Sequence, residues 1–120
     1  MSNEQVQKLQ ERMKRFGLRV IRLVEVFPKG RAAGVVSNQM VRSGTSAGAN
    51  YRAACRARSR AECVSKMGIV EEELDETLYW LEVSLDAGFI SKKEADGMIQ
   101  EGNELLSIVV SSIRTAKRGS

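Results

Sequence analysis

A run of arginines is the part of the sequence with the clearest chemical potential. The stretch NYRAACRARSRAEC, residues 50–63, places Arg52, Arg56, Arg58 and Arg60 within nine residues. Arg52 and Arg56 are four residues apart, so on a helix they share one face. Guanidinium groups along a surface bind the phosphates of a nucleic acid without reading its sequence, because each contact is electrostatic and releases counterions. The run therefore predicts a nucleic-acid interface.

A second set of basic residues precedes this run. Its arginines recur at steps of three and four, which places them on one stripe of a helix: Arg12, Arg15, Arg19 and Arg22. Together the two sets predict a basic surface on the first two helices. Aromatic residues that would stack on bases are not interleaved with these cations, and only Tyr51 is near. A second hypothesis therefore stays open, in which the stripe pairs with carboxylates of a neighbouring subunit in a protein-interaction scaffold without nucleic acid.

The charges are divided unevenly between the two halves of the chain. Of the 120 residues, 1–60 hold 13 Lys/Arg and 3 Asp/Glu, whereas 61–120 hold 6 and 12. Such polarity steers anionic partners to the basic half or lets the halves attract each other, within the fold or across subunits. The acidic residues cluster in one segment: Glu71, Glu72, Glu73, Asp75, Glu76, Glu82 and Asp86. They predict a solvated face or the partner of the basic stripe.

Catalytic and metal chemistry lack their usual components. The chain has no histidine, so the Glu-x-x-His pairs of carboxylate metal bundles are missing, and we expect no metal and no cofactor. The segment SGTSAGA contains hydroxyl groups but no base to activate them, and it lacks the Gly-Lys-Ser/Thr ending of a phosphate loop. We therefore expect a protein that is not an enzyme and has no catalytic residues. Cys55 and Cys63 are interpreted as reduced, partly buried thiols.

Apolar residues recur every three or four positions along most of the chain, which is typical of amphipathic helices. The pattern predicts helices over residues 4–27, 32–56, 59–87 and 91–117. Short connections between helices of this length favour an all-α, antiparallel up-down-up-down four-helix bundle with a single domain over residues 1–120. No signal-like segment or membrane-length apolar run is present, so we expect a cytoplasmic protein without a membrane partner.

Helix ends are marked by specific residues. Asn3 is a candidate N-cap, and Pro28 with Gly30 is expected to end the first helix. Two capping boxes are predicted, in which a serine and a glutamate three residues later satisfy each other's backbone N–H groups. They are formed by Ser59 with Glu62 and by Ser91 with Glu94.

Three further residues are assigned structural roles. The small residues of SGTSAGA predict close packing at a helix crossing, where Asn50 is expected to supply a buried amide hydrogen bond that fixes helix register. Tyr79 and Trp80 are adjacent and point about 100° apart on a helix, so both cannot be central to one core stripe. One of them is therefore predicted to face a subunit interface, where Tyr and Trp are favoured.

Several segments resemble one bacterial family. The stretch NQMVRSGTSAGANYRAACRARSRAE, the stretch EELDETLYWLE and the GFIS turn are similar to those of the 23S rRNA intervening-sequence proteins, over about residues 6–116. The family also resembles the accessory proteins of diversity-generating retroelements. This resemblance implies a homopentamer without known catalytic activity and with RNA or DNA as a partner. If the protein comes from a retroelement, it also implies a reverse transcriptase as a partner. Ser46 and Asn50 match the family pattern S-x-x-x-N-x-x-E, but Ala53 replaces the glutamate.

Overall fold

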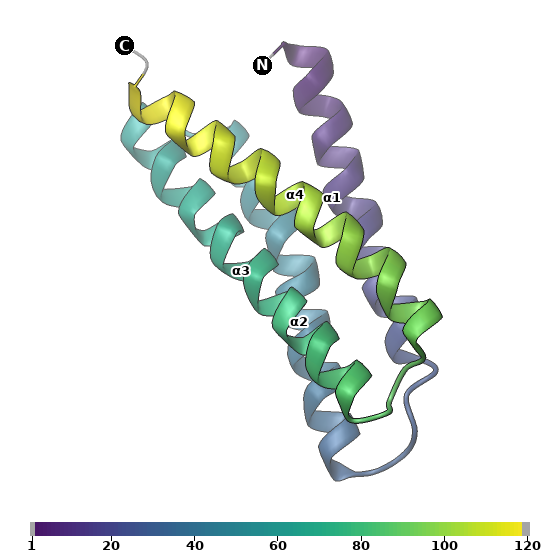
Figure 1. The fold of residues 1–120 in the computed structure, drawn as a ribbon. Helices are drawn as coiled ribbons and strands as arrows, with labels where there is room; N and C mark the ends of the chain where they lie inside the picture. Colours follow the sequence, from purple (N-terminus) through teal and green to yellow (C-terminus); the bar gives the residue numbers. More distant parts are fainter. Residues whose placement is uncertain (1, 119–120) are drawn as a thin grey trace.

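The protein is an elongated bundle of four antiparallel helices (Figure 1). The computed structural model describes residues 2–118, and the bundle measures 50 × 23 × 19 Å. The helices are α1 (Asn3–Val24), α2 (Arg31–Cys55), α3 (Arg60–Asp86) and α4 (Lys92–Arg118). The predicted all-α four-helix fold is therefore confirmed. Both chain ends lie at one end of the bundle, which is also where α2 turns into α3, while the other two connections lie at the opposite end (Figure 1).

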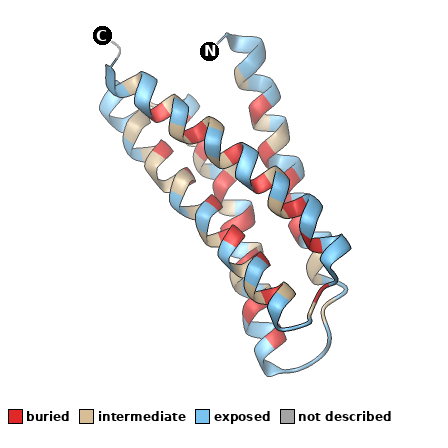
Figure 2. Ribbon diagram, in the orientation of Figure 1, coloured by how far each residue is buried: buried red, intermediate tan, exposed pale blue. Residues whose placement is uncertain are grey.

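The helices pack in chain order around a common core. α2 contacts α1 and α3, and α4 contacts α3 and α1, while no close backbone contact joins the diagonal pairs within residues 2–118. The α1–α2 edge of the bundle is therefore opposite the α3–α4 edge. The core contains residues from every helix, and the buried positions follow the inward face of each one (Figure 2). Its largest fully buried side chains are Phe16, Met13, Met40, Leu74, Leu81 and Leu105.

The first helix ends earlier than the apolar spacing predicts. Regular α1 stops at Val24, and the next three residues form turn hydrogen bonds to residues three positions back, such as Phe27 N–H to the Val24 carbonyl at 3.1 Å. Phe27 still packs inward, because its ring lies against Phe89 of the other connection at this end, with centroids 5.6 Å apart. The apolar spacing correctly predicts that Phe27 packs inward, but a residue can pack inward from a turn as well as from a helix.

The caps differ in detail from the predicted ones. Ser2, rather than Asn3, is the N-cap of α1, and it forms a complete capping box with Gln5. Ser59 caps α3 by accepting from the Glu62 N–H at 3.1 Å, but the Glu62 carboxylate accepts from the Arg58 N–H at 3.2 Å instead of from Ser59. Both bonds of the Ser91 and Glu94 box are present, at 2.8 and 3.1 Å, and these bonds lower the pKa of Glu94.

Glycines bring α1 and α2 unusually close together. A Cβ atom added to Gly44 would lie 2.9 Å from a methyl group of the buried Val20, and one added to Gly17 would lie 3.2 Å from the Gly44 carbonyl oxygen. A Cβ atom added to Gly48 would be in ordinary van der Waals contact with the Met13 backbone, at 3.5 Å. The close helix crossing predicted from SGTSAGA is therefore confirmed, with α1 as the neighbour. On the other side of α2, the buried Ser43 and Thr77 hydroxyl oxygens are 2.8 Å apart and join α2 to α3.

Two arginines bridge helices through paired carboxylates. Arg12 of α1 donates to Glu101 of α4 through two nitrogens, at 3.0 and 2.7 Å, and to Glu104 at 3.1 Å. Hydrogen bonding to Glu101 raises the pKa of Arg12. Arg42 of α2 pairs with Glu73 at 2.9 Å and with Glu76, both on α3. The Arg12–Glu101 pair is bidentate, which is the strong form of the charged hydrogen bond, whereas Arg42 makes one bond to each of its two carboxylates.

The Arg42 network predicts a pH-dependent stability. The Arg42 guanidinium holds the pKa of Glu76 below its ordinary value of 4.5, and the Trp80 indole N–H contributes to this lowering. A carboxyl group with a lowered pKa stabilises the fold above its unfolded pKa and loses that effect as the pH falls through the folded pKa. Glu76→Gln should therefore lower the free energy of unfolding at pH 7, by about 1 kcal/mol or less because the pair is partly exposed.

Denaturant unfolding of both proteins between pH 7 and pH 3 checks this expectation. The difference between wild type and Glu76→Gln should shrink as the pH falls below 4.5, where the wild-type carboxyl group becomes protonated. Glu82→Gln is the control, since this exposed carboxylate of the same helix lies outside the network, and the free energy of unfolding should stay nearly unchanged. A Glu76→Gln difference that is constant across this range would contradict the assigned network.

Candidate nucleic-acid interface

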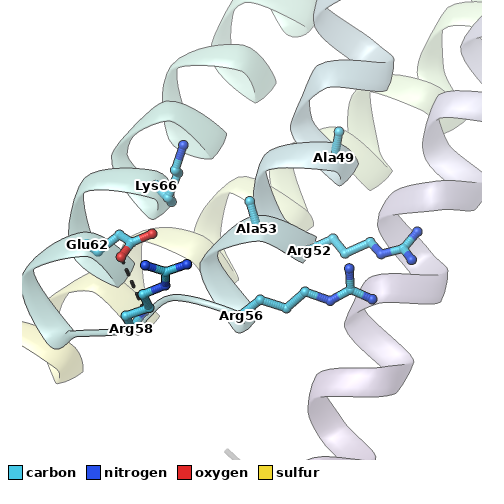
Figure 3. Close-up of a pocket in the computed structure, with 7 residues that line it drawn as sticks. All are labelled: Ala49, Arg52, Ala53, Arg56, Arg58, Glu62 and Lys66. Carbon is cyan, nitrogen blue, oxygen red and sulfur yellow. Dashed lines mark hydrogen bonds between the residues drawn. The ribbon is translucent and has the colours of Figure 1, made fainter.

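The turn from α2 to α3 carries a hollow lined mostly by cations (Figure 3). Its volume is about 520 Å³, and its basic side chains are Arg52, Arg56, Arg58 and Lys66. Two alanines of α2, Ala49 and Ala53, complete the α2 side, and their short side chains leave the space open. The hollow exists because α2 ends at Cys55 and α3 starts at Arg60, so the arginines at this corner project into solvent.

The corner cations have no carboxylate partner within the described part of the chain. No ion pair is formed by Arg52, Arg56, Arg58 or Lys66, in contrast to Arg12 and Arg42. Glu62 is the one carboxylate that lines the hollow, and it accepts from the backbone N–H of Arg58 (Figure 3). The site is therefore strongly positive and open to solvent, which suits an anionic chain that passes along a surface.

The predicted arginines of this region occupy two kinds of position. Arg52 and Arg56 extend from the end of α2 towards α1, while Arg58 lies on the turn beside Glu62 (Figure 3). Arg60, the first residue of α3, is exposed next to the hollow but does not line it. Sequence reasoning missed Lys66, which joins the site because it lies one helical turn beyond Glu62 on α3.

The arginines of α1 form a separate set. Arg12 is held by α4 carboxylates, and Arg19 with Arg22 lines a small hollow against Glu94 and Met98 of α4. Arg15 is exposed. The predicted continuous surface of helices 1 and 2 is therefore divided: this stripe follows the α1–α4 side of the bundle, while Arg52 and Arg56 lie at the α1–α2 side. The sequence spacing shows that these arginines share one face of α1, but it does not show which neighbouring helix that face lies against.

A groove of about 560 Å³ follows the α1–α2 edge. Its cations are Lys14 of α1 and the same Arg52 and Arg56 that border the corner hollow. Leu18 and Ile21 line it while 41% and 39% exposed, and Gly17 and Gly48 are among its lining residues. Sequence reasoning missed this groove, although the apolar Leu18 and Ile21, which are out of phase with the buried Leu9, Met13 and Phe16 of the same helix, were a usable signal.

The thiols and Tyr51 lie together beneath this corner. Tyr51 is buried, and its pKa is raised by that burial and by the neighbouring Cys55 thiol. Burial and Cys55 likewise raise the pKa of Cys63. Both cysteines are free; Cys63 is half-buried, but Cys55 is exposed, which corrects the expectation that both are partly buried. A raised pKa disfavours the thiolate, so Cys63 is poorly suited to nucleophilic chemistry.

The remaining predicted residues lie apart from the arginine corner. Asn50 is half-buried, but its amide donates to the carbonyl and hydroxyl oxygens of Ser46, at 3.0 and 2.9 Å, so it bonds within α2 rather than between helices. Tyr79 is 58% exposed on α3. Trp80 is half-buried, packs edge-on against the Tyr79 ring and donates to Glu76 at 3.1 Å. Tyr79 is therefore the member of the pair with a large free surface.

Neither a metal cluster nor a membrane span is found in residues 2–118. No group of three or more Cys, Asp or Glu side chains in this range is placed to hold a metal ion. No helix there has the length and apolar character needed to cross a membrane.

The model of the 23S rRNA-intervening sequence protein family matches residues 5–111. The chain belongs to this family. The match includes residues of all four helices and ends within α4, so the family assignment does not rest on the arginine run alone.

A solved structure supports the same assignment. The chain is similar to the crystal structure of a protein of unknown function from the S23 ribosomal protein family of Bacteroides thetaiotaomicron, with 32% identity and a TM-score of 0.83. The similarity covers 89% of this chain and 99% of that one. No curated protein matches the chain. Family and neighbour thus establish the bundle, while neither description assigns an activity.

Proposed function

We propose that this family member is a non-catalytic homo-oligomer that associates with nucleic acid through the corner between α2 and α3. The observation that carries the proposal is the contrast between the arginines. Arg12 and Arg42 are satisfied by carboxylates within the bundle, whereas the corner cations Arg52, Arg56, Arg58 and Lys66 line one hollow without such partners in the described residues. Cations that the fold does not neutralise are the ones available to phosphates.

The chemistry of the corner favours backbone contact over base recognition. Aromatic side chains are missing from the hollow, so base stacking contributes little, and the guanidinium groups would contact phosphate oxygens. The expected behaviour is little sequence preference and an affinity that falls steeply with salt. The oligomer, a pentamer by the family resemblance, would present several corners and so strengthen individually weak contacts.

Salt-dependent RNA binding tests the proposal. Since the family name refers to 23S rRNA, a structured RNA is the natural probe, with binding followed by fluorescence anisotropy. The corner variant Arg58→Gln/Arg60→Gln/Lys66→Gln removes three cations. Each phosphate contact contributes about 0.7–0.9 to the slope of log affinity against log salt, so the slope should fall by about 2–3 and binding should weaken at least about tenfold near 0.1 M salt.

The control variant carries the same loss of charge at the opposite end of the bundle. Lys29 in the α1–α2 connection, Arg31 at the start of α2 and Lys93 at the start of α4 are exposed there. Their replacement by glutamine should leave most of the affinity intact. Equal losses in the two variants would show that only net charge matters and would reject the corner as the site. RNA binding that is absent in the wild type would reject the nucleic-acid function altogether and favour the scaffold hypothesis.

A further inference from the structure

We propose that the α1–α2 edge of one copy of this chain docks against the α3–α4 edge of another copy. This inference rests on the homo-oligomer of the proposed function and names the two surfaces that would form it. It arises from two hollows on opposite edges of the bundle, one basic and one acidic, whose charges are unpaired within the described residues.

The first surface is the α1–α2 groove. Lys14, Arg52 and Arg56 supply its positive charge, and none of them forms an ion pair with another described residue. Glu11 is the carboxylate in its lining, so the groove keeps an excess of positive charge. Leu18 and Ile21 are large aliphatic side chains that remain about two-fifths exposed, at 41% and 39%. The close approach of the two helices at their glycines leaves a hollow rather than a ridge at this edge. A partner with carboxylates and apolar groups would complement this surface.

The second surface is a hollow of about 420 Å³ between α3 and α4. Glu71, Glu72 and Asp75 supply its negative charge, with Leu106 and Val110 as apolar neighbours. These carboxylates differ from Glu73 and Glu76, which are held by Arg42, because none of the three has an ion-pair partner in the described residues.

Tyr79 extends this acidic surface along α3. It lies four residues after Asp75 and seven after Glu72, so all three share one helical face. Its ring is 58% exposed, the largest exposed fraction of any large apolar side chain described here. In this docking, Tyr79 would contact the neighbouring copy beside the unpaired carboxylates.

The relation between the two surfaces determines the kind of assembly. The α1–α2 edge and the α3–α4 edge face opposite directions, so one copy cannot pair them internally, and two copies joined through them leave one surface of each kind free. Such a head-to-tail contact closes into a ring when the rotation per copy permits. A standard interface buries about 800 Å² on each partner. Two such interfaces use a modest part of the 7353 Å² surface of this chain.

The docking leaves part of the arginine corner uncovered. Arg52 and Arg56 border both the groove and the corner hollow, so in the docked assembly they face the neighbouring copy. Arg58, Arg60 and Lys66 do not line the groove and are the cations left for nucleic acid. The RNA test above uses only these last three residues, so it is independent of the subunit contact.

Charge reversal of each surface, singly and together, tests the docking. Lys14→Glu/Arg52→Glu reverses the groove, and Glu72→Lys/Asp75→Lys reverses the acidic surface. Each variant should repel its own copies and have the light-scattering mass of a monomer after nuclease treatment. The four substitutions combined reverse both surfaces, restore attraction and should recover the wild-type mass. Mixing the two single-surface variants should also give complexes, because each keeps one intact surface that fits the other.

The control Glu4→Lys/Glu25→Lys makes the same charge change as the acidic-surface variant, away from both hollows, and should keep the wild-type mass. If the wild type is an oligomer and the single-surface variants keep its mass, the named surfaces are wrong while the homo-oligomer stands. Failure of both the combined variant and the mixture to assemble would likewise overturn the docking. A wild type that is monomeric at low and high salt would overturn the docking and the proposed homo-oligomer together, whatever the outcome with RNA.

Discussion

Gly44→Val should lower the free energy of unfolding by about 3 kcal/mol, the upper end of what overpacking of a core usually costs. The first added carbon would already lie 2.9 Å from a methyl group of Val20 and 3.2 Å from its Cβ. Val20 is fully buried and β-branched, so it has little freedom to rotate away. The strain would separate α1 from α2, and equilibrium denaturation in urea measures it as a lower midpoint.

Gly34→Ala is the matched control for this prediction. Gly34 lies in the same helix, but a Cβ atom added there meets nothing within 4 Å. Alanine should therefore stabilise the protein, by up to about 1 kcal/mol, through its higher helix propensity. An unchanged urea midpoint for Gly44→Val would show that α1 and α2 can separate without loss, which contradicts a tightly packed crossing.

Phe16→Ala should cost about 3–5 kcal/mol, since it removes a large buried ring and leaves a cavity that the helices cannot fully collapse. Phe16 is 1% exposed and projects from α1 towards α4, where its ring tip lies 3.3 Å from the position of a Cβ on Gly102. Leu78 of α3 reaches the same position, with its Cδ2 atom 2.8 Å away. Phe16 therefore fills the place where α1, α3 and α4 meet, and its loss weakens three helices at once.

Phe27→Ala provides the comparison. Because the Phe27 ring is only half-buried in the connection, this substitution should lower the free energy of unfolding clearly less than Phe16→Ala. Thermal or urea unfolding of both variants, with circular dichroism to verify helix content, measures the difference. Equal losses for the two rings would mean that Phe16 contributes no more to the core than a residue at the end of the bundle.

The sequence was sufficient for the fold because each helix has a continuous inward face. The apolar spacing and the serine caps predict four helices, and the short connections then leave few arrangements. Phe27 shows the limit of this reasoning: an apolar residue in phase with a helix can be buried from a turn. Ser2 shows another, because two good cap residues stand side by side, and only the Ser2 position puts Gln5 three residues later.

The candidate site was less predictable because the partners of a charge are set by tertiary packing. The spacing of Arg12 with Arg15 indicates a helical stripe, yet Arg12 finds Glu101, a residue 89 positions away in the sequence. Nothing in the local pattern distinguishes it from Arg58, whose guanidinium forms no ion pair with a described residue. Lys14 and Lys66 were missed for the same reason. Each joins a binding surface only because a second helix brings other cations beside it, and the local sequence does not show that helix.

The unequal contacts among the helices also bear on the order of folding. α2 and α3 share the most extensive contact in the bundle, and only residues 56–59 separate them. Closing so short a loop costs little chain entropy, so the α2–α3 hairpin can form early from local encounters. α1 contacts α4 only sparsely and depends on the glycine face of α2. We therefore expect α1 to dock after the α2–α3 hairpin has formed, because the surface that it packs against includes Gly44 and Gly48 of α2.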